Sequence, residues 1–226
     1  MSGSRSADLA PEARDALRKV LDLLAVERAS VSSVVDERAW KVHVDDSLTG
    51  LRVRELRDAK RIADIGAGAG FPGLALAVAL PEADVDLVES VGRKCDFMRR
   101  AIAAAGIANA RVLERRSEDL AAAEGRESYD AVTARAVGRL STLAELASPL
   151  LREGGVLVAW KGRRDAGEEE QLARAGDALA MRPEEILDVG ADAGSRHRHL
   201  HALRKLAPTP EDLPRRAGMA KKRPRG

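Results

Sequence analysis

The sequence predicts an α/β fold in which a mostly parallel, doubly wound sheet of the Rossmann-like type follows an N-terminal helical cap. First, an apolar strand pattern at residues 61–65 runs directly into a glycine-dense turn at residues 66–70, before a helix pattern begins near Pro72. Second, apolar runs of strand length then alternate with amphipathic helical patterns as far as Leu206. Third, Glu89 ends the second strand pattern about twenty residues after the turn, as in nucleotide-cofactor sites.

The composition favours one sizeable domain with appendages. The chain has 226 residues, 45% of them hydrophobic, and a net charge of +2, so its basic character is local rather than global. The single cysteine, Cys95, excludes an internal disulfide framework and fits a reducing cytoplasm. The sequence has neither an apolar run of membrane-spanning length nor the apolar core of a signal peptide. We therefore expect a cytoplasmic protein without membrane association, and nothing in the sequence requires more than a monomer.

The patterns divide the chain into a helical cap over residues 1–55, a Rossmann-like body over residues 56–206 and a basic, mobile tail over residues 207–226. The cap contains a helix pattern over residues 8–27 and one or two further helices over residues 34–51. Strands are expected at residues 61–65, 83–89, 110–113, 129–134, 155–160, 185–189 and 199–206, the last two as an antiparallel pair. Helices are expected at residues 72–80, 93–105, 118–123, 140–151 and 168–181.

The glycine turn indicates a cofactor site. Residues 68–73 satisfy the G-x-G-x-x-G pattern of dinucleotide enzymes, which alone is a weak signal. Asp64 adds an acidic residue before the turn, where it would repel a pyrophosphate but suit the sulfonium and ammonium groups of S-adenosylmethionine. We therefore expect S-adenosylmethionine as the cofactor, with its ribose hydroxyls bound by the acidic residue after the second strand. The candidate residues here are Asp64, Gly66, Gly68, Gly70, Glu89 and Ser90.

Two further segments lie at the same carboxyl-terminal edge of the predicted sheet. Ser117 and Glu118 follow the third strand, where they could bind the adenine, although Ser117 could equally cap a short helix. Arg135 stands at the carboxyl end of the fourth strand. Because ligands of open α/β sheets bind outside these ends, we expect Arg135 to point into the site.

Several polar segments are candidates for substrate contacts. His43, Asp46 and Ser47 precede the glycine turn, and they form either an acid–base or metal cluster or a surface helix with a capping residue. Lys161 and Arg163 lie in a basic loop after the fifth strand. The tail has many basic residues, which suit either a handle for nucleic acid or a solubilising end.

A metal site is not expected. His197, His199 and His201 alternate in a strand pattern, which would allow zinc or nickel. The arginines between them disfavour a bound cation, and no carboxylate is adjacent in sequence. A polar strand face is the preferred interpretation.

With these features placed, the sequence resembles the bacterial RsmG family, also called GidB. The motifs that carry the resemblance are IADIGAGAGFPG from Ile62, SYDAVTARAVGRLSTLAEL at residues 128–146, the Trp160-Lys161-Gly162 strand end, Arg198-His199-Leu200, and the basic tail from Pro214. The resemblance implies a class I S-adenosylmethionine-dependent methyltransferase that modifies N7 of a guanine in 16S ribosomal RNA, guanine 527 in the 530 loop. It also implies the small ribosomal subunit as partner.

The resemblance assigns roles to individual positions. The family's cofactor positions match Gly66, Phe71, Glu89, Ser117, Glu118 and Arg135 in this sequence. Its His–Asp–Ser stretch matches His43, Asp46 and Ser47. As a separate hypothesis, the candidates for guanine or phosphate contacts are Arg135, Lys161, Arg163 and Arg198. The chain departs from the family pattern at Val42, where an arginine is usual, and at residues 29–34, which lack an Asn-Leu-Thr motif.

The implied chemistry needs alignment rather than a base. Guanine N7 carries a lone pair at neutral pH, so we expect no general base, and Arg135 is the one catalytic candidate, acting by position. The alternative is a methyltransferase acting on another RNA, a small molecule or a protein. A nicotinamide-dependent dehydrogenase that uses G-x-G-x-x-G and a non-catalytic RNA-binding module are the rival classes.

Overall fold

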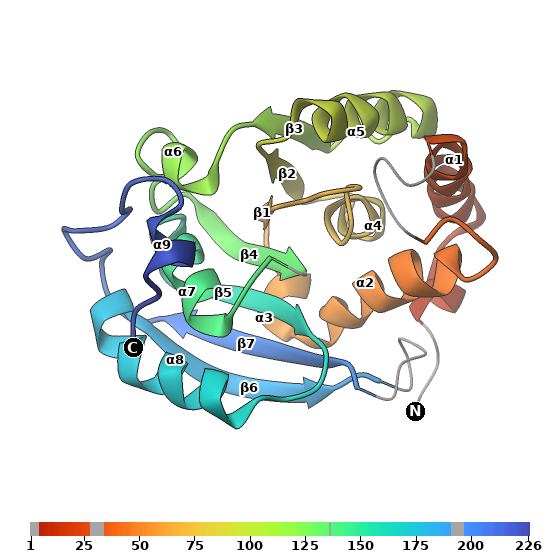
Figure 1. Cartoon of the computed structure of the whole chain (residues 1–226). Coiled ribbons are helices and arrows are strands. Elements are labelled where there is room, and N and C mark those ends of the chain that lie inside the picture. Colours follow the sequence, from red (N-terminus) through yellow and green to blue (C-terminus); the bar gives the residue numbers. More distant parts are fainter. Residues whose placement is uncertain (1–4, 28–33, 136, 191–196) are drawn as a thin grey trace.

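The computed structural model describes residues 5–27, 34–135, 137–190 and 197–226 and contains a seven-stranded sheet of order β3-β2-β1-β4-β5-β7-β6 (Figure 1). The strands are β1 (Arg61–Ile65), β2 (Asp84–Glu89), β3 (Ala110–Glu114), β4 (Tyr129–Arg135), β5 (Leu151–Lys161), β6 (Met181–Asp188) and β7 (His199–Lys205). Strands β1 to β5 are parallel, and β7 runs antiparallel to both β5 and β6. The predicted Rossmann-like fold class and the antiparallel final pair are confirmed.

Helices cover both faces of the sheet (Figure 1). One face packs against α1 (Pro11–Glu27), α4 (Gly73–Ala79) and α5 (Gly92–Ala105), and the other against α6 (Ser117–Ala121), α7 (Leu140–Ala147) and α8 (Ala166–Leu179). Neighbouring strand residues alternate between the two cores: Ile62 belongs to the first and Ala63 to the second. Within the described ranges, no helix combines the length and apolarity needed to cross a membrane.

The segment before β1 shares its core with the sheet. It contains a 3-10 turn at Arg5–Asp8, helix α1, a π-helical segment at Trp40–Asp45, and the short helices α2 (Asp46–Leu48) and α3 (Arg54–Arg57), with a second 3-10 turn at Thr49–Arg52 between them. Leu17, Val20, Leu24, Val44 and Leu48 from this segment are buried in the same cluster as the strand residues of the first face. The cap and the body therefore have one continuous hydrophobic core.

Three predicted boundaries are wrong in the second half of the chain. Helix α7 ends at Ala147, not at Leu151, because Leu151 already pairs with Tyr129 as the start of β5. Helix α8 begins earlier than expected, where the Asp165 carboxylate accepts the Glu168 N–H at 3.1 Å. Strand β6 begins at Met181 rather than Glu185, since this edge strand is held by backbone pairing to β7 while its first residues after Met181 face solvent.

The basic tail packs against the body. Leu213 and Ala220 are only 2% and 3% exposed, so two apolar side chains of this segment are buried. Its short helix α9 (Met219–Lys222) lies against α7 (Figure 1). The side chains of Arg216, Lys221 and Lys222 remain exposed. The tail thus has one face against the protein and one basic face toward solvent.

Candidate cofactor and substrate site

The turn after β1 requires glycine. Gly66, Gly68 and Gly70 have φ angles of +65°, +62° and +88°, which L side chains rarely adopt. A Cβ atom on Gly66 would also lie 2.8 Å from Cγ2 of Val137, and one on Gly70 would lie 2.4 Å from Cδ1 of Leu74. A Cβ atom on Gly68 would meet only a carbonyl oxygen at 3.8 Å, so the turn is open at that point. The turn therefore packs tightly on both sides and leaves a free approach at its centre.

Asp64 lies behind the turn. Its side chain is fully buried, with Oδ2 accepting the Gly73 N–H at 2.9 Å and Oδ1 accepting the Thr133 hydroxyl at 2.9 Å. Burial raises the pKa of this carboxyl group to about 6, although both hydrogen bonds oppose the shift. The carboxylate joins the start of α4 to β4 and thereby braces the turn. Its position gives no support to the predicted direct contact with a cationic ligand.

Glu89 is held against the turn from the end of β2. Oε2 accepts the Gly68 N–H at 3.1 Å, and Oε1 accepts the N–H groups of Ser90 and Val91 at 2.8 and 3.0 Å. The amine of Lys94 lies 3.9 Å from Oε2. A carboxylate offers about four lone-pair positions, so a further donor such as a ribose hydroxyl still has a place. The turn and Glu89 are in direct contact, and these residues fit S-adenosylmethionine, while the ribose contact stays a prediction.

Ser117 and Glu118 begin α6, and the C-terminal tail reaches them. The Ser117 hydroxyl lies 3.2 Å from Glu118 Oε2, while Oε1 of Glu118 accepts the Gly218 N–H at 2.7 Å. The residue at the cap position is Arg116, so the alternative in which Ser117 caps the helix is wrong. The contact with adenine stays a prediction, but the carboxylate expected to make it is fixed by a residue one hundred positions later.

Asp46 brings two arginines together at the edge of the sheet. Its Oδ2 lies 2.9 Å from Nη1 of Arg135, which also donates to the Val42 carbonyl at 3.0 Å. Its Oδ1 lies 2.9 Å from Nε of Arg198, at ion-pair distance but without an aligned N–H. The Trp160 indole N–H donates to the Asp46 carbonyl at 2.8 Å and holds that residue in place. Burial lowers the pKa of Arg135, and the charge of Asp46 opposes this shift.

His43 links this cluster to the glycine turn. Its ring stacks on Phe71, with centroids 5.0 Å apart and planes at 25°, and its Nδ1 lies 3.5 Å from Nη2 of Arg135. Burial, followed by the nearby Arg135 charge, lowers the pKa of His43, so the imidazole is neutral at pH 7. Ser47 is fully buried and donates to the His43 carbonyl. The surface-helix interpretation of this stretch is wrong, because His43, Asp46 and Ser47 are all buried.

The remaining basic candidates are Lys161, the last residue of β5, and Arg163 in the loop that follows. The Lys161 amine is 2.8 Å from Glu168 Oε2 and 2.9 Å from the Gly138 carbonyl, so it fastens α8 to the loop after β4. Arg163 is exposed, with Nη2 3.5 Å from Nε2 of His197. Among the residues that the structure describes, no group of three or more His, Cys, Asp or Glu side chains is arranged to hold a metal ion.

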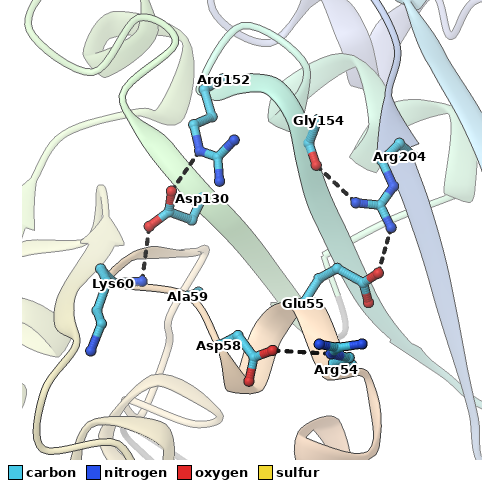
Figure 2. Close-up of a pocket in the computed structure, with 9 residues that line it drawn as sticks. All are labelled: Arg54, Glu55, Asp58, Ala59, Lys60, Asp130, Arg152, Gly154 and Arg204. Carbon is cyan, nitrogen blue, oxygen red and sulfur yellow. Dashed lines mark hydrogen bonds and ion pairs between the residues drawn. The ribbon is translucent and has the colours of Figure 1, made fainter.

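One hollow of about 410 Å³ opens near the amino ends of the parallel strands β1, β4 and β5, away from the glycine turn (Figure 2). Several of its charged side chains form ion pairs: Arg152 Nε lies 2.6 Å from Asp130 Oδ1, and Arg204 Nη2 lies 2.5 Å from Glu55 Oε1. Asp130 also accepts the Lys60 N–H at 2.8 Å, at the start of β1. Since ligands of open α/β sheets bind at the carboxyl ends of the strands, this hollow is separate from the candidate site.

Comparison with known proteins identifies the family. The family model described as rRNA small subunit methyltransferase G (GidB) matches residues 19–200. The chain belongs to this family. The GidB relative from Rubrobacter xylanophilus, named ribosomal RNA small subunit methyltransferase G, is 37% identical over 98% of this chain and 95% of its own length. The protein of the same name from Gloeobacter violaceus is 41% identical over 84% of this chain and 76% of its own length.

Solved structures support the fold. A SAM-dependent methyltransferase from Aquifex aeolicus superposes with a TM-score of 0.57 at 15% identity, covering 76% of this chain and 94% of that one. This GidB chain therefore has the sheet topology and helical layers of a methyltransferase.

The departure from the family pattern at residues 29–34 lies outside the described residues except for Val34, whose carbonyl oxygen is 2.9 Å from Nε2 of His43.

Sequence reasoning missed the residues that support the site from behind. Thr133 holds Asp64, Trp160 holds Asp46, and Glu145 on α7 pairs with Arg215 of the tail. Glu145 had a signal: it interrupts the otherwise apolar and small residues of Leu140–Ala147 and is 3% exposed. A carboxylate in such a position requires a partner, although its identity is not readable from the sequence.

Proposed function

We propose that this chain transfers a methyl group from S-adenosylmethionine to N7 of a guanine in 16S ribosomal RNA. Membership of the family and the names of its relatives support the substrate class. The observation that carries the proposal is the stacking of Phe71 in the turn on His43, beside Arg135. This stacking places the glycine turn, which suits a methyl donor, next to the cluster of Arg135 and Arg198, whose guanidinium groups suit RNA.

The cofactor would be held by the chain's own fixed groups. The open centre of the turn near Gly68 would take the methionine portion, Glu89 would accept the ribose hydroxyls, and Glu118 with Ser117 would bind the adenine. When bound, S-adenosylmethionine supplies an electrophilic methyl group on a sulfonium. Because Glu89 is already oriented by three N–H groups, little ordering of its side chain would remain to be done on binding.

The protein would act on the guanine by binding, orienting and excluding water. The lone pair of guanine N7 would take the methyl group directly as the carbon–sulfur bond breaks and S-adenosylhomocysteine leaves, so no proton would have to be removed. The guanidinium groups of Arg135 and Arg198 would contact the guanine edge or a phosphate. Alignment of this kind is worth on the order of 7–11 kcal/mol in favourable cases.

Phosphate contacts would supply most of the RNA affinity. Aromatic residues make up only 2% of the chain, so stacking of single-stranded bases has few platforms. Exposed Arg163, Lys221 and Lys222 provide positive charge. RNA binding should therefore weaken steeply as salt increases. We further propose that the protein acts as a cytoplasmic monomer on the small ribosomal subunit or its precursor.

The proposal is tested with methyl-labelled S-adenosylmethionine and small ribosomal subunits from cells that lack this enzyme. Label in 7-methylguanosine of the 16S RNA, at a single mapped position, is the expected result. Subunits from cells that contain the enzyme are the matched control and should accept almost no label. Absence of label with cofactor binding intact would contradict the RNA substrate, and binding of NAD in place of S-adenosylmethionine would contradict the methyltransferase chemistry.

A further inference from the structure

The C-terminal tail is joined to α7 by an ion pair between partly buried Arg215 and buried Glu145. Nε and Nη2 of Arg215 lie 2.5 and 2.6 Å from Oε1 and Oε2 of Glu145, an arrangement with two parallel hydrogen bonds. The Glu145 side chain is 2% exposed and that of Arg215 is 22% exposed. These two charge-assisted hydrogen bonds join the tail to α7 and favour its docked position.

Further along, the docked tail touches the candidate adenine site. The Gly218 N–H donates to Glu118 Oε1 at 2.7 Å, and the Thr142 hydroxyl donates to the Ala220 carbonyl at 3.3 Å. Gly218 has a φ angle of +82°, which lets the chain turn toward α6 at this point. The contact with Glu118 is therefore enclosed between two anchors, Arg215 before it and Ala220 after it.

We propose that tail docking positions Glu118 and thereby sets the affinity of the protein for S-adenosylmethionine. A glutamate at the start of a short helix has several free side-chain rotations, and a ligand that needs one orientation must otherwise restrict them on binding. Arg215 and Glu145 are positioning residues in this scheme, since they act through Glu118. The inference rests on the proposed function in one respect, the assignment of Glu118 to the cofactor site.

The test measures the dissociation constant of S-adenosylhomocysteine by calorimetry, with no RNA present. Arg215→Ala should weaken binding on the order of tenfold, the effect of losing one well-oriented charged hydrogen bond. Arg216→Ala is the matched control, because the neighbouring arginine is exposed, and its affinity should stay within about twofold of wild type. Arg215→Lys should restore part of the loss. Wild-type affinity in Arg215→Ala would overturn the proposal.

A second variant tests the proposal if Arg215→Ala fails to fold. Deletion of residues 214–226 combined with Glu145→Gln removes the tail without leaving a buried charge, and it should also bind on the order of tenfold more weakly. Wild-type affinity in this folded variant would equally overturn the proposal.

Coupling also predicts a reciprocal effect on the tail. Saturating S-adenosylhomocysteine should slow trypsin cleavage of the wild type at Lys221 and Lys222. The expected factor is about the ratio of the S-adenosylhomocysteine dissociation constants of Arg215→Ala and the wild type, and the ligand should have no such effect on cleavage of Arg215→Ala. Equal cleavage rates with and without ligand in the wild type would contradict the coupling. Neither measurement involves RNA, so failure to label 16S RNA leaves this inference standing, whereas a wild-type protein that binds no S-adenosylhomocysteine would overturn both.

Discussion

Arg135 and Asp46 are 89 positions apart in the sequence, yet Nη1 of the arginine lies 2.9 Å from Oδ2 of the aspartate inside the protein. The aspartate side chain is 1% exposed and the arginine side chain 13%. Because the other carboxylate oxygen of Asp46 faces Arg198, one negative charge holds two guanidinium groups. This relationship makes Asp46 the residue that holds both arginines, and we expect the aspartate to be a determinant of stability.

Asp46→Asn should therefore destabilise the protein. With the charge removed, the largely buried Arg135 guanidinium loses its compensating partner, and the free energy of unfolding should fall by about 3 kcal/mol. Urea denaturation monitored by tryptophan fluorescence measures the change. Asp15→Asn is the control, because Asp15 pairs with Arg18 at the surface and its loss should change stability by less than about 0.5 kcal/mol. Equal effects of the two substitutions would contradict the role of Asp46.

Asp64 should make the stability of the protein depend on pH. Burial raises its pKa from 3.8 to about 6 in the folded state, so the folded protein retains a proton that the unfolded chain releases. The stability that this proton contributes is fully present below the unfolded pKa and is lost as pH rises through the folded pKa. Between about pH 4 and about pH 7, Asp64 should lower the free energy of unfolding by about 2 kcal/mol.

The measurement for Asp64 is urea denaturation of the wild type and of Asp64→Asn at both pH values. The difference in stability between the two proteins should shift by about 2 kcal/mol in favour of the asparagine variant at the higher pH. Because both proteins share all other titrating groups, the contributions of those groups to the pH dependence of stability cancel in the difference. A difference that does not change with pH would show that Asp64 is ionised in the folded protein throughout this range.

Gly50 should tolerate no side chain. A Cβ atom there would lie 2.5 Å from Cζ2 of Trp160, whose buried indole also holds Asp46. Gly50→Ala should lower the free energy of unfolding by about 1–3 kcal/mol through overpacking. Gly162→Ala is the matched control, since its Cβ atom would approach only the His197 carbonyl oxygen at 3.7 Å, and it should change stability by less than about 0.5 kcal/mol. Thermal denaturation followed by circular dichroism distinguishes the two.

Glu89 should determine cofactor affinity. Glu89→Ala removes the acceptor for the N–H groups of Gly68, Ser90 and Val91 and the candidate ribose contact, and the dissociation constant of S-adenosylhomocysteine should rise at least about tenfold. Glu114 is the matched control, because it pairs with Glu89 in register but forms an exposed ion pair with Arg99. Glu114→Ala should stay within about twofold of wild type. Similar losses in both variants would remove Glu89 from the site.

Local physical rules explain why much of the fold was predictable. The glycines at 66 and 70 are required by positive φ angles, and the apolar residues Ile62, Ala63 and Ile65 before them predict a buried strand. Boundaries failed where a local pattern is ambiguous: the start of β6 is held by pairing to β7, and that pairing leaves no mark on the exposed, charged residues of an edge strand.

The sequence by itself determined the order of strands and helices, the glycine turn and the placement of Glu89 at the end of β2, because each depends on residues close together in the chain. Only the tertiary structure decided that Asp46 joins Arg135 to Arg198, that Asp64 stands behind the turn, and that the tail reaches Glu118. The reason is physical: a buried charge must find an opposite charge or a donor, and the fold, not the neighbouring sequence, decides which one lies within reach.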